Sequence, residues 1–218
     1  MQTYSHVIIT AVLNRALKEQ QQYDPAGAPK LMVAGHELPP LNSRALLLGS
    51  FAPDIPLILL TIIFLASDLW AGRRPGPDVD PSQFNIAYLF DYLYFHNRWV
   101  ITLQNLFHGP LVILLYIALG YGAWRRAQKW GATLFWFAVS CGLHTLIDIP
   151  LHTDDGPLLF FPFYWETRFR SPISYWDPAH YGNYWSMFEH LVVLGLLIYL
   201  WVDWWRRRST VKAVISNQ

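Results

Sequence analysis

The chain has 218 residues, of which 53% are hydrophobic, 17% aromatic and 14% charged, and its formal net charge is +1. Average soluble domains carry about 25% charged residues, so this composition is typical of a membrane protein. A net charge so close to zero argues against nucleic acid as a partner, and a single cysteine excludes an internal disulfide.

The first forty residues combine a short helix with a turn-rich stretch. Residues 4–17 predict a helix that is too short for a complete span, because crossing a bilayer takes about 20 apolar residues. It could be a partial span, a surface helix or a packed element, and its polar exceptions are His6 and Asn14. The proline- and glycine-rich residues 24–40 predict a loop.

Four long apolar stretches predict membrane-spanning helices. They cover residues 45–66, 107–124, 130–150 and 188–205. The aromatic residues 84–99 predict an interfacial helix or a packed segment, and residues 151–186 predict a long loop with a belt of Trp and Tyr. The expected fold is therefore an all-α, polytopic membrane helical bundle. Residues 1–208 form a single integral-membrane domain in this prediction, and residues 209–218 form a cytoplasmic tail.

The first of these spans carries a carboxylate between two prolines. Asp54 lies between Pro53 and Pro56. We expect the helix to break there, because a proline inside a helix removes a backbone hydrogen bond. Carbonyl groups that the break frees would lie beside the carboxylate.

Basic residues follow two of the predicted spans and indicate an orientation. Arg125 and Arg126 follow the second span, and Arg206, Arg207 and Arg208 follow the fourth. By the positive-inside rule these ends face the cytoplasm, and we expect both chain termini there as well. Counted from these ends at about 1.5 Å per residue, the polar side chains within the spans lie toward the outer half of the bundle.

A histidine and an aspartate near the end of the third span are the strongest sign of a site. His144 and Asp148 are four residues apart, so they share one helix face, and ionisable groups at membrane depth are usually functional. Three further residues are expected near the same height, namely His6, Asp54 and His108. Imidazole and carboxylate ligands without thiolate suit a divalent metal, zinc first and manganese or iron(II) as alternatives. Such a metal polarises an ester or phosphoryl oxygen and lowers the pKa of water to about 7.

Other polar residues are weaker candidates. Glu189 and His190, at the entrance of the last span, are candidates for a catalytic general base or acid. A single histidine in a membrane helix is more often a hydrogen-bonding residue than a ligand, so His36, His96 and His180 are expected to be surface or interfacial residues. The patterns GxSxG, P-loop and HExxH are absent from the sequence, which disfavours serine hydrolysis, nucleotide-driven chemistry and the common zinc protease.

Two features beyond the third span are expected at the edge of the site. His152 and the turn at residues 154–156 are expected to form its lip. Arg168 and Arg170 could bind phosphate as bidentate donors, and lipid head groups at the membrane interface would explain them equally well.

In order along the chain, these motifs resemble those of the bacterial membrane-bound metal-dependent hydrolases of the YdjM type. They are YSHVIITA with His6, FAPDIP with Asp54, NLFHGPLV with His108, GLHTLIDIP with His144 and Asp148, and the segment that begins DGPLLFFPF. The similarity covers most of residues 1–175. It implies a protein of the bacterial inner membrane that hydrolyses an ester or phosphoester of a lipid-like substrate.

The chain departs from the family pattern at two positions. His96 stands twelve residues before His108, where the family usually has the two motifs close together. Pro56 replaces a second acidic residue of the family's PDID motif, so a second metal would have fewer carboxylates to hold it.

The order His, Asp, His, HxxxD is also similar to that of the zinc-dependent phospholipase C and P1 nuclease group. That resemblance implies a phosphoester substrate, with Asp148 able to bridge two metals. Two other classes stay open. One is a non-catalytic subunit of a membrane complex, and the other is a pigment- or haem-binding membrane protein.

Overall fold

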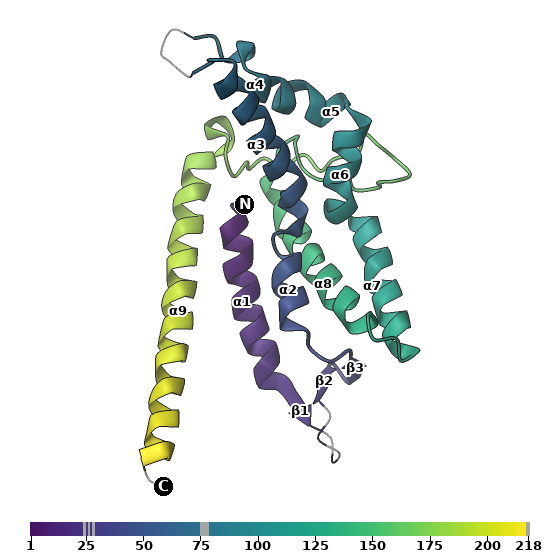
Figure 1. Ribbon diagram of the computed structural model, residues 1–218, viewed down its shortest axis with the longest axis vertical. Coiled ribbons are helices and arrows are strands. Elements are labelled where there is room, and N and C mark those ends of the chain that lie inside the picture. Colours follow the sequence, from purple (N-terminus) through teal and green to yellow (C-terminus); the bar gives the residue numbers. More distant parts are fainter. Residues whose placement is uncertain (24, 26, 28, 75–78, 217–218) are drawn as a thin grey trace.

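Long helices run side by side along one axis of the molecule, whose computed structural model describes residues 1–23, 25, 27, 29–74 and 79–216 (Figure 1). The α-helices among these residues are α1 (Thr3–Gln20), α2 (Ser43–Gly49), α3 (Ile55–Trp70), α4 (Asn85–Tyr88), α5 (Tyr94–His96), α6 (Arg98–His108), α7 (Pro110–Arg125), α8 (Gly131–Asp148) and α9 (Gly182–Ser216). Short 3₁₀ turns and a π-helical turn connect them, namely η1 (Ala52–Asp54), η2 (Pro81–Gln83), η3 (Leu89–Leu93, the π-helix), η4 (Ile149–Leu151) and η5 (Pro178–His180). The predicted all-α class is confirmed.

Three helical stretches in the described part of the chain are long and apolar enough to cross a membrane. They are Ala52–Trp70, Gly131–Leu151 and Gly182–Ser209. Helices α6 and α7 make a fourth if they count as one span, although they are bent by 47° where His108 meets Pro110. Large apolar side chains on α3 and α9, such as Ile62 and Leu194, are exposed. Their exposure fits surfaces that face lipid.

The first predicted span is broken into two helices. Helix α2 ends at Gly49, η1 ends at Asp54, and α3 begins at Ile55. Pro53 and Pro56 stand at the first turns of η1 and α3, where a missing backbone N–H costs little. The predicted break at the prolines is therefore confirmed, and it divides the predicted span over residues 45–66 between α2 and α3.

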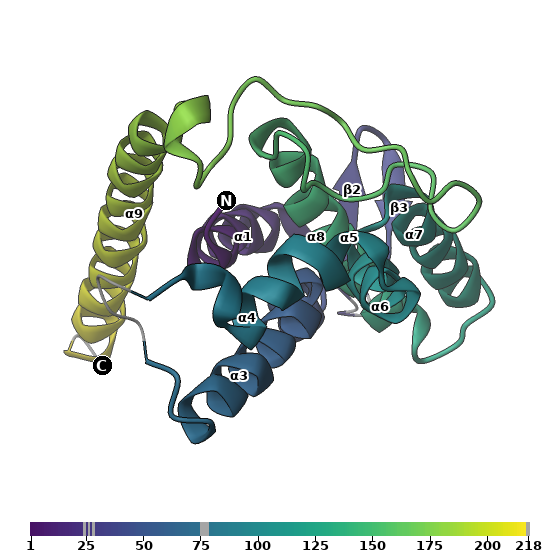
Figure 2. The ribbon, with the colours of Figure 1, turned by 90° about the horizontal axis from the view of Figure 1, so that it is seen from above.

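Helix α1 enters the centre of the bundle. Seen from above, its start lies among α9, α3 and α8 (Figure 2). His6, Thr10 and Asn14 are spaced by four residues and are buried, so α1 turns a polar face toward the bundle. Of the alternatives for this helix, the structure selects the packed element. Because α9 ends at the far end of the molecule, the two termini do not lie at the same end (Figure 1).

Part of the predicted loop over residues 24–40 is a small sheet. Strands β1 (Gln21–Tyr23), β2 (Pro29–Val33) and β3 (His36–Leu38) pair antiparallel in the order β1-β2-β3. The two-residue turn between β2 and β3 consists of Ala34 and Gly35, both with positive φ, which matches the twist of a hairpin. Residues 24, 26 and 28, which the loop prediction also covered, lie outside the described residues.

The sheet is attached to the bundle by one buried side chain. Leu31 is fully buried and belongs to a hydrophobic cluster with Leu46 of α2 and Trp136 of α8. The Trp136 indole N–H donates to the carbonyl of Pro40 at 3.0 Å. These contacts attach residues 29–40 to α8. Strands of three to five residues are too short for their pattern of apolar residues to predict such a contact.

The two aromatic segments differ in regularity. Residues 84–99 contain the short helices α4 and α5 with η3 between them, and α4 packs against α3. Residues 152–181 form the predicted long loop, in which η5 is a single helical turn. Both segments lie at the end of the bundle where α3 ends and α6 begins (Figure 1).

Helices α7 and α8 approach each other closely at glycine residues. A β-carbon at Gly120 would lie 2.5 Å from the backbone nitrogen of Phe135 and 2.8 Å from its Cα. Small residues let helix backbones touch, which strengthens packing in a membrane, where no hydrophobic effect drives helices together.

We expect Gly120→Ala to lower the free energy of unfolding by about 1–3 kcal/mol, because the added methyl group overlaps the backbone of α8. Gly122→Ala on the same helix is the control, since no heavy atom lies within 4 Å of its β-carbon position. That control should be neutral or stabilising by about 0.5–1 kcal/mol. Thermal unfolding in detergent measures both variants, and equal stability would contradict the close approach of α7 and α8.

Candidate metal centre

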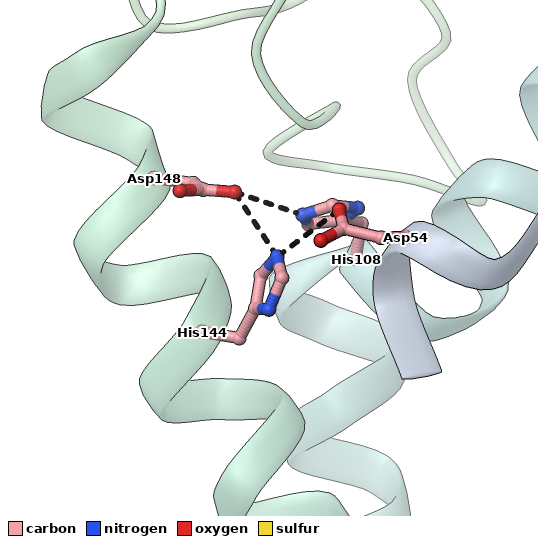
Figure 3. Close-up of side chains that lie close together, drawn as sticks. All are labelled: Asp54, His108, His144 and Asp148. Carbon is pink, nitrogen blue, oxygen red and sulfur yellow. Dashed lines mark hydrogen bonds and ion pairs between the residues drawn. The ribbon is translucent and has the colours of Figure 1, made fainter. Parts of the chain in front are cut away.

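Four ionisable side chains point at one another where α2 gives way to α3, where α6 ends and where α8 ends (Figure 3). They are Asp54, His108, His144 and Asp148. One ligand atom from each lies within 4.8 Å of the corresponding atom of every other. His108, His144 and Asp148 are buried, and Asp54 is half-buried.

Two of the distances within this cluster are longer than ordinary hydrogen bonds. His144 Nε2 lies 3.1 Å from Asp148 Oδ2 and 3.5 Å from Asp54 Oδ1, and His108 Nε2 lies 3.4 Å from Asp148 Oδ2. Hydrogen bonds from nitrogen to oxygen are mostly about 2.9–3.0 Å long. A tetrahedral zinc ion with bonds of about 2.0–2.2 Å would hold its ligand atoms about 3.3–3.6 Å apart. The separations of 3.4 and 3.5 Å fall in that range, and the four ligand atoms lie within 4.8 Å of one another, so the cluster could hold one small ion.

His144 is oriented by the break that follows α2. Its Nδ1 donates a hydrogen bond of 2.7 Å to the carbonyl of Ser50, the C-cap residue of α2. This bond leaves Nε2 as the ring nitrogen with a free lone pair, and Nε2 is buried without a hydrogen-bond partner among the described residues. A backbone carbonyl on the far nitrogen is the usual way in which proteins orient a metal-binding histidine.

His108 is oriented by residues of its own helix and of α8. Gln104 lies one turn earlier on α6, and its amide nitrogen is 3.0 Å from His108 Nδ1. Rotating this amide by 180° lets Gln104 Oε1, which is otherwise buried without a partner, accept the proton of Nδ1. Thr145 donates to the His108 carbonyl at 3.2 Å, which anchors the end of α6 to α8.

His6 lies against the cluster as a fifth member. Its Nε2 is 3.0 Å from Asp148 Oδ1, and its ring stacks on that of His144 with the centroids 3.6 Å apart. The amino group of Met1 also donates to Asp148 Oδ1, at 2.9 Å. The two oxygens of Asp148 thus face different partners, Oδ1 toward α1 and Oδ2 toward His108 and His144.

A cavity of about 540 Å³ opens beside the cluster. Asp54, His108 and Asp148 form part of its wall. The rest of the wall combines aromatic and acidic residues, which include Phe90, Asp91, Tyr94, Phe95, Asp154, Asp155, Tyr175 and Trp176. A small molecule that enters this cavity would therefore contact three of the four side chains directly, namely Asp54, His108 and Asp148.

His152 lines the cavity, and its place at the lip of the site stays a prediction. Its Nδ1 lies 2.9 Å from Asp155 Oδ1, and its Nε2 lies 3.8 Å from Asp148 Oδ2. Burial by itself would lower the pKa of His152, but the contacts with Asp148 and Asp155 outweigh it and raise the pKa above its ordinary value. For Tyr94, burial raises the pKa to about 12. The Tyr94 hydroxyl therefore stays protonated, and it donates to the Asp155 carbonyl.

Glu189 and His190 contact α1 and do not line this cavity. Glu189 is buried and accepts hydrogen bonds from the Gln2 backbone N–H at 2.8 Å and from the Ser5 hydroxyl at 2.5 Å. His190 is exposed and lies 2.7 Å from the Tyr4 hydroxyl. These contacts join α9 to the start of α1. The catalytic role expected of both residues stays a prediction.

The remaining histidines lie apart from the four-residue cluster. His36 is exposed on β3, His96 is exposed at the end of α5, and His180 pairs with Asp177 at 2.7 Å in η5. Sequence reasoning missed Thr3, whose hydroxyl donates to Asp54 Oδ2, and the supporting roles of Ser50 and Gln104. Only Gln104 had a local signal, since it precedes His108 by one helical turn.

A comparison with protein-family models agrees with the order of these motifs. The model described as YdjM inner membrane protein matches residues 1–211. The chain belongs to the YdjM inner membrane protein family. No curated protein and no solved structure matches it. The expected family is confirmed, and with the candidate spans it makes the chain a membrane protein. The likeness to zinc-dependent phospholipase C and P1 nuclease still rests only on the order of residues.

We expect purified protein to hold at least one divalent metal ion per chain, because two imidazoles and two carboxylates that face one another are donors that such an ion prefers. His144→Ala/Asp148→Ala should abolish this binding. The half-buried pair in η5 gives a matched control, since Asp177→Ala/His180→Ala removes the same residue types from outside the cluster. Metal analysis by mass spectrometry measures all three proteins. No metal in the wild type, with none taken up on addition, would contradict a metal centre.

Proposed function

We propose that this chain is a membrane-embedded, metal-dependent hydrolase of an ester or phosphoester in a lipid-like substrate. The observation that carries the proposal is the meeting of Asp54, His108, His144 and Asp148 beside a cavity of about 540 Å³, whose wall includes Asp54, His108 and Asp148. Two imidazoles and two carboxylates suit zinc, with manganese or iron(II) as alternatives.

The four side chains would hold the metal, and the surrounding residues would fix their directions. When bound, such a metal polarises an ester or phosphoryl oxygen and lowers the pKa of water. Ser50 and Gln104 hold the two imidazole rings, and Thr3 holds Asp54. Fixed donors matter because a loosely held site loses both affinity and geometry.

His152 is the side chain best placed to move a proton. It lines the cavity next to Asp148, and Asp155 fixes its ring through Nδ1. We therefore propose His152, ahead of Glu189 and His190, as the group that would protonate a leaving group. Glu189 acts in this proposal as a positioning residue, because its two hydrogen bonds hold the start of α1 against the cluster.

A lipid-like substrate follows from the surroundings of the cavity. Aromatic residues form much of its wall, and the helices that bear the four donors include stretches able to cross a membrane. A water-soluble substrate would not need an enzyme with so large an exposed apolar surface.

A non-catalytic structural role is the competing proposal. Asp148 already has close contacts with the Met1 amino group, His6, His108 and His144, so the cluster could be a polar core that only joins helices. The separations of 3.4 and 3.5 Å, which are longer than ordinary hydrogen bonds, favour the metal instead.

We expect the metal-loaded protein to hydrolyse bis-p-nitrophenyl phosphate or dihexanoyl phosphatidylcholine, and His144→Ala/Asp148→Ala to remove that activity. His152→Gln should keep the metal but lower kcat by about 10²-fold, the typical contribution of a general acid. Asp177→Ala/His180→Ala is again the control. Metal without hydrolysis of any ester or phosphoester tested would leave only a metal-binding structural protein.

The orientation of the bundle is also a proposal, with the basic end of α9 in the cytoplasm. A reporter that is active only in the cytoplasm should then give a signal when it is fused after Ser209, because Arg206, Arg207 and Arg208 favour retention on that side. A reporter signal from the outer side would invert the compartment to which the cavity opens.

A further inference from the structure

A second cavity, which we call the arginine groove, adjoins the cavity of about 540 Å³ beside the four-residue cluster. We call that first space the metal cavity. The arginine groove has a volume of about 660 Å³ and is lined by Arg98, Arg168 and Arg170. Phe95 and Asp154 belong to the walls of both cavities, so the two spaces are neighbours. The groove lies at the end of the bundle where α6 begins, on the same side as the long loop.

The arginine groove carries positive charge that nearby carboxylates do not neutralise. Asp154 and Glu166 also line it, but among the described residues no ion pair joins either of them to an arginine of the groove. By contrast, Arg15, Arg73 and Arg207 each pair with a carboxylate at 2.7–2.9 Å. Guanidinium groups left unpaired within one groove suit an anionic ligand.

Part of the groove is already held in place. The Arg168 guanidinium donates to the carbonyl of Gly156 and lies over the rings of Tyr94 and Phe95, 5.2 and 5.6 Å from their centroids. Arg98 lies 5.8 Å from the ring of Trp165. Stacked guanidinium groups lose less conformational freedom when they bind, and their planar fork matches the oxygens of a phosphate.

The metal cavity next to the groove has the opposite character. Its wall contains five aspartates, Asp54, Asp91, Asp148, Asp154 and Asp155. These carboxylates attract a metal ion and repel a free anion, whereas the arginine groove attracts the anion. A ligand with one reacting ester and one separate anionic group would therefore satisfy both spaces.

We propose that the arginine groove is a subsite for a phosphate group of the substrate. This phosphate is a recognition group, held by Arg98, Arg168 and Arg170, and the ester that reacts is a different one, placed in the metal cavity. Only the placement of the reacting ester in the metal cavity rests on the proposed function. Binding of phosphate to the groove does not need the metal.

Equilibrium dialysis of metal-free protein in a phosphate-free detergent, with radioactive inorganic phosphate as the probe, tests the subsite. Arg98→Gln/Arg170→Gln removes the two guanidinium groups that no backbone carbonyl holds, and it should weaken phosphate binding by about tenfold or more. Arg125→Gln/Arg126→Gln removes the same charge from the other end of the same bent helix pair and should bind like the wild type. Equal binding by the wild type and Arg98→Gln/Arg170→Gln would overturn the proposal.

Competition and kinetics then separate the source of the phosphate from the reaction. Dihexanoyl phosphatidate should displace the bound phosphate more strongly than inorganic phosphate does if a lipid headgroup is the ligand, and equally if free phosphate is. In metal-loaded protein, Arg98→Gln/Arg170→Gln should raise KM about tenfold for an ester that carries a phosphate and leave kcat unchanged. The same variant should hydrolyse p-nitrophenyl butyrate like the wild type. Phosphate binding that is lost in the variant, together with no hydrolysis by the wild type, would reject the proposed function and keep the subsite.

Discussion

The structure is organised around one buried carboxylate, that of Asp148. It is 2% exposed and contacts side chains or the amino group of residues from α1, α6 and its own helix. An isolated carboxylate in such a place costs several kcal/mol, so the chain must bring compensating groups to it. Helix α1 supplies His6, and the bend between α6 and α7 supplies His108. The bundle can form this centre only because these segments meet at the end of α8.

Three of the four donors of the cluster lie where a helix breaks, bends or ends, and His144 lies one turn before the end of α8. Asp54 lies at the proline break between α2 and α3, His108 at the bend before Pro110, and Asp148 at the last residue of α8. Such positions free backbone carbonyls, and Ser50 shows the use of one of them, since its carbonyl accepts the proton of His144 Nδ1. Irregular backbone at membrane depth is tolerated where it lines a cavity or is buried in protein.

Two cavities of opposite charge lie side by side beyond this centre. The acidic one contains the donors for a metal, and the arginine groove contains guanidinium groups without ion pairs. Aromatic rings separate them, with Arg168 stacked on the rings of Tyr94 and Phe95. Under the proposed function, this division would let one ligand present a reacting ester to the metal donors and an anionic group to the arginines. The segments that build it are the irregular residues 152–181 and the short helices before α6.

Local patterns in the sequence determined the all-α class, the break at Asp54 and the shared face of His144 and Asp148. Each depends on residues within a few positions of one another, where helix geometry and proline sterics act directly. The ordered set of motifs extended this to a candidate cluster, and His6, Asp54 and His108 do lie beside that helix face.

Only the tertiary structure decided which partners fix those side chains. The bond from His144 to Ser50 joins residues 94 positions apart, and the bond from Ser5 to Glu189 joins residues 184 positions apart. The periodicity of apolar residues along the sequence does not predict such contacts, because they arise from the packing of α1 and α2 against α8 and α9. For the same reason the sequence did not indicate the small sheet, whose short strands are held by the burial of Leu31. The sequence determined which chemical groups are present and on which helix faces they lie, and the packing of the helices decided which of them meet.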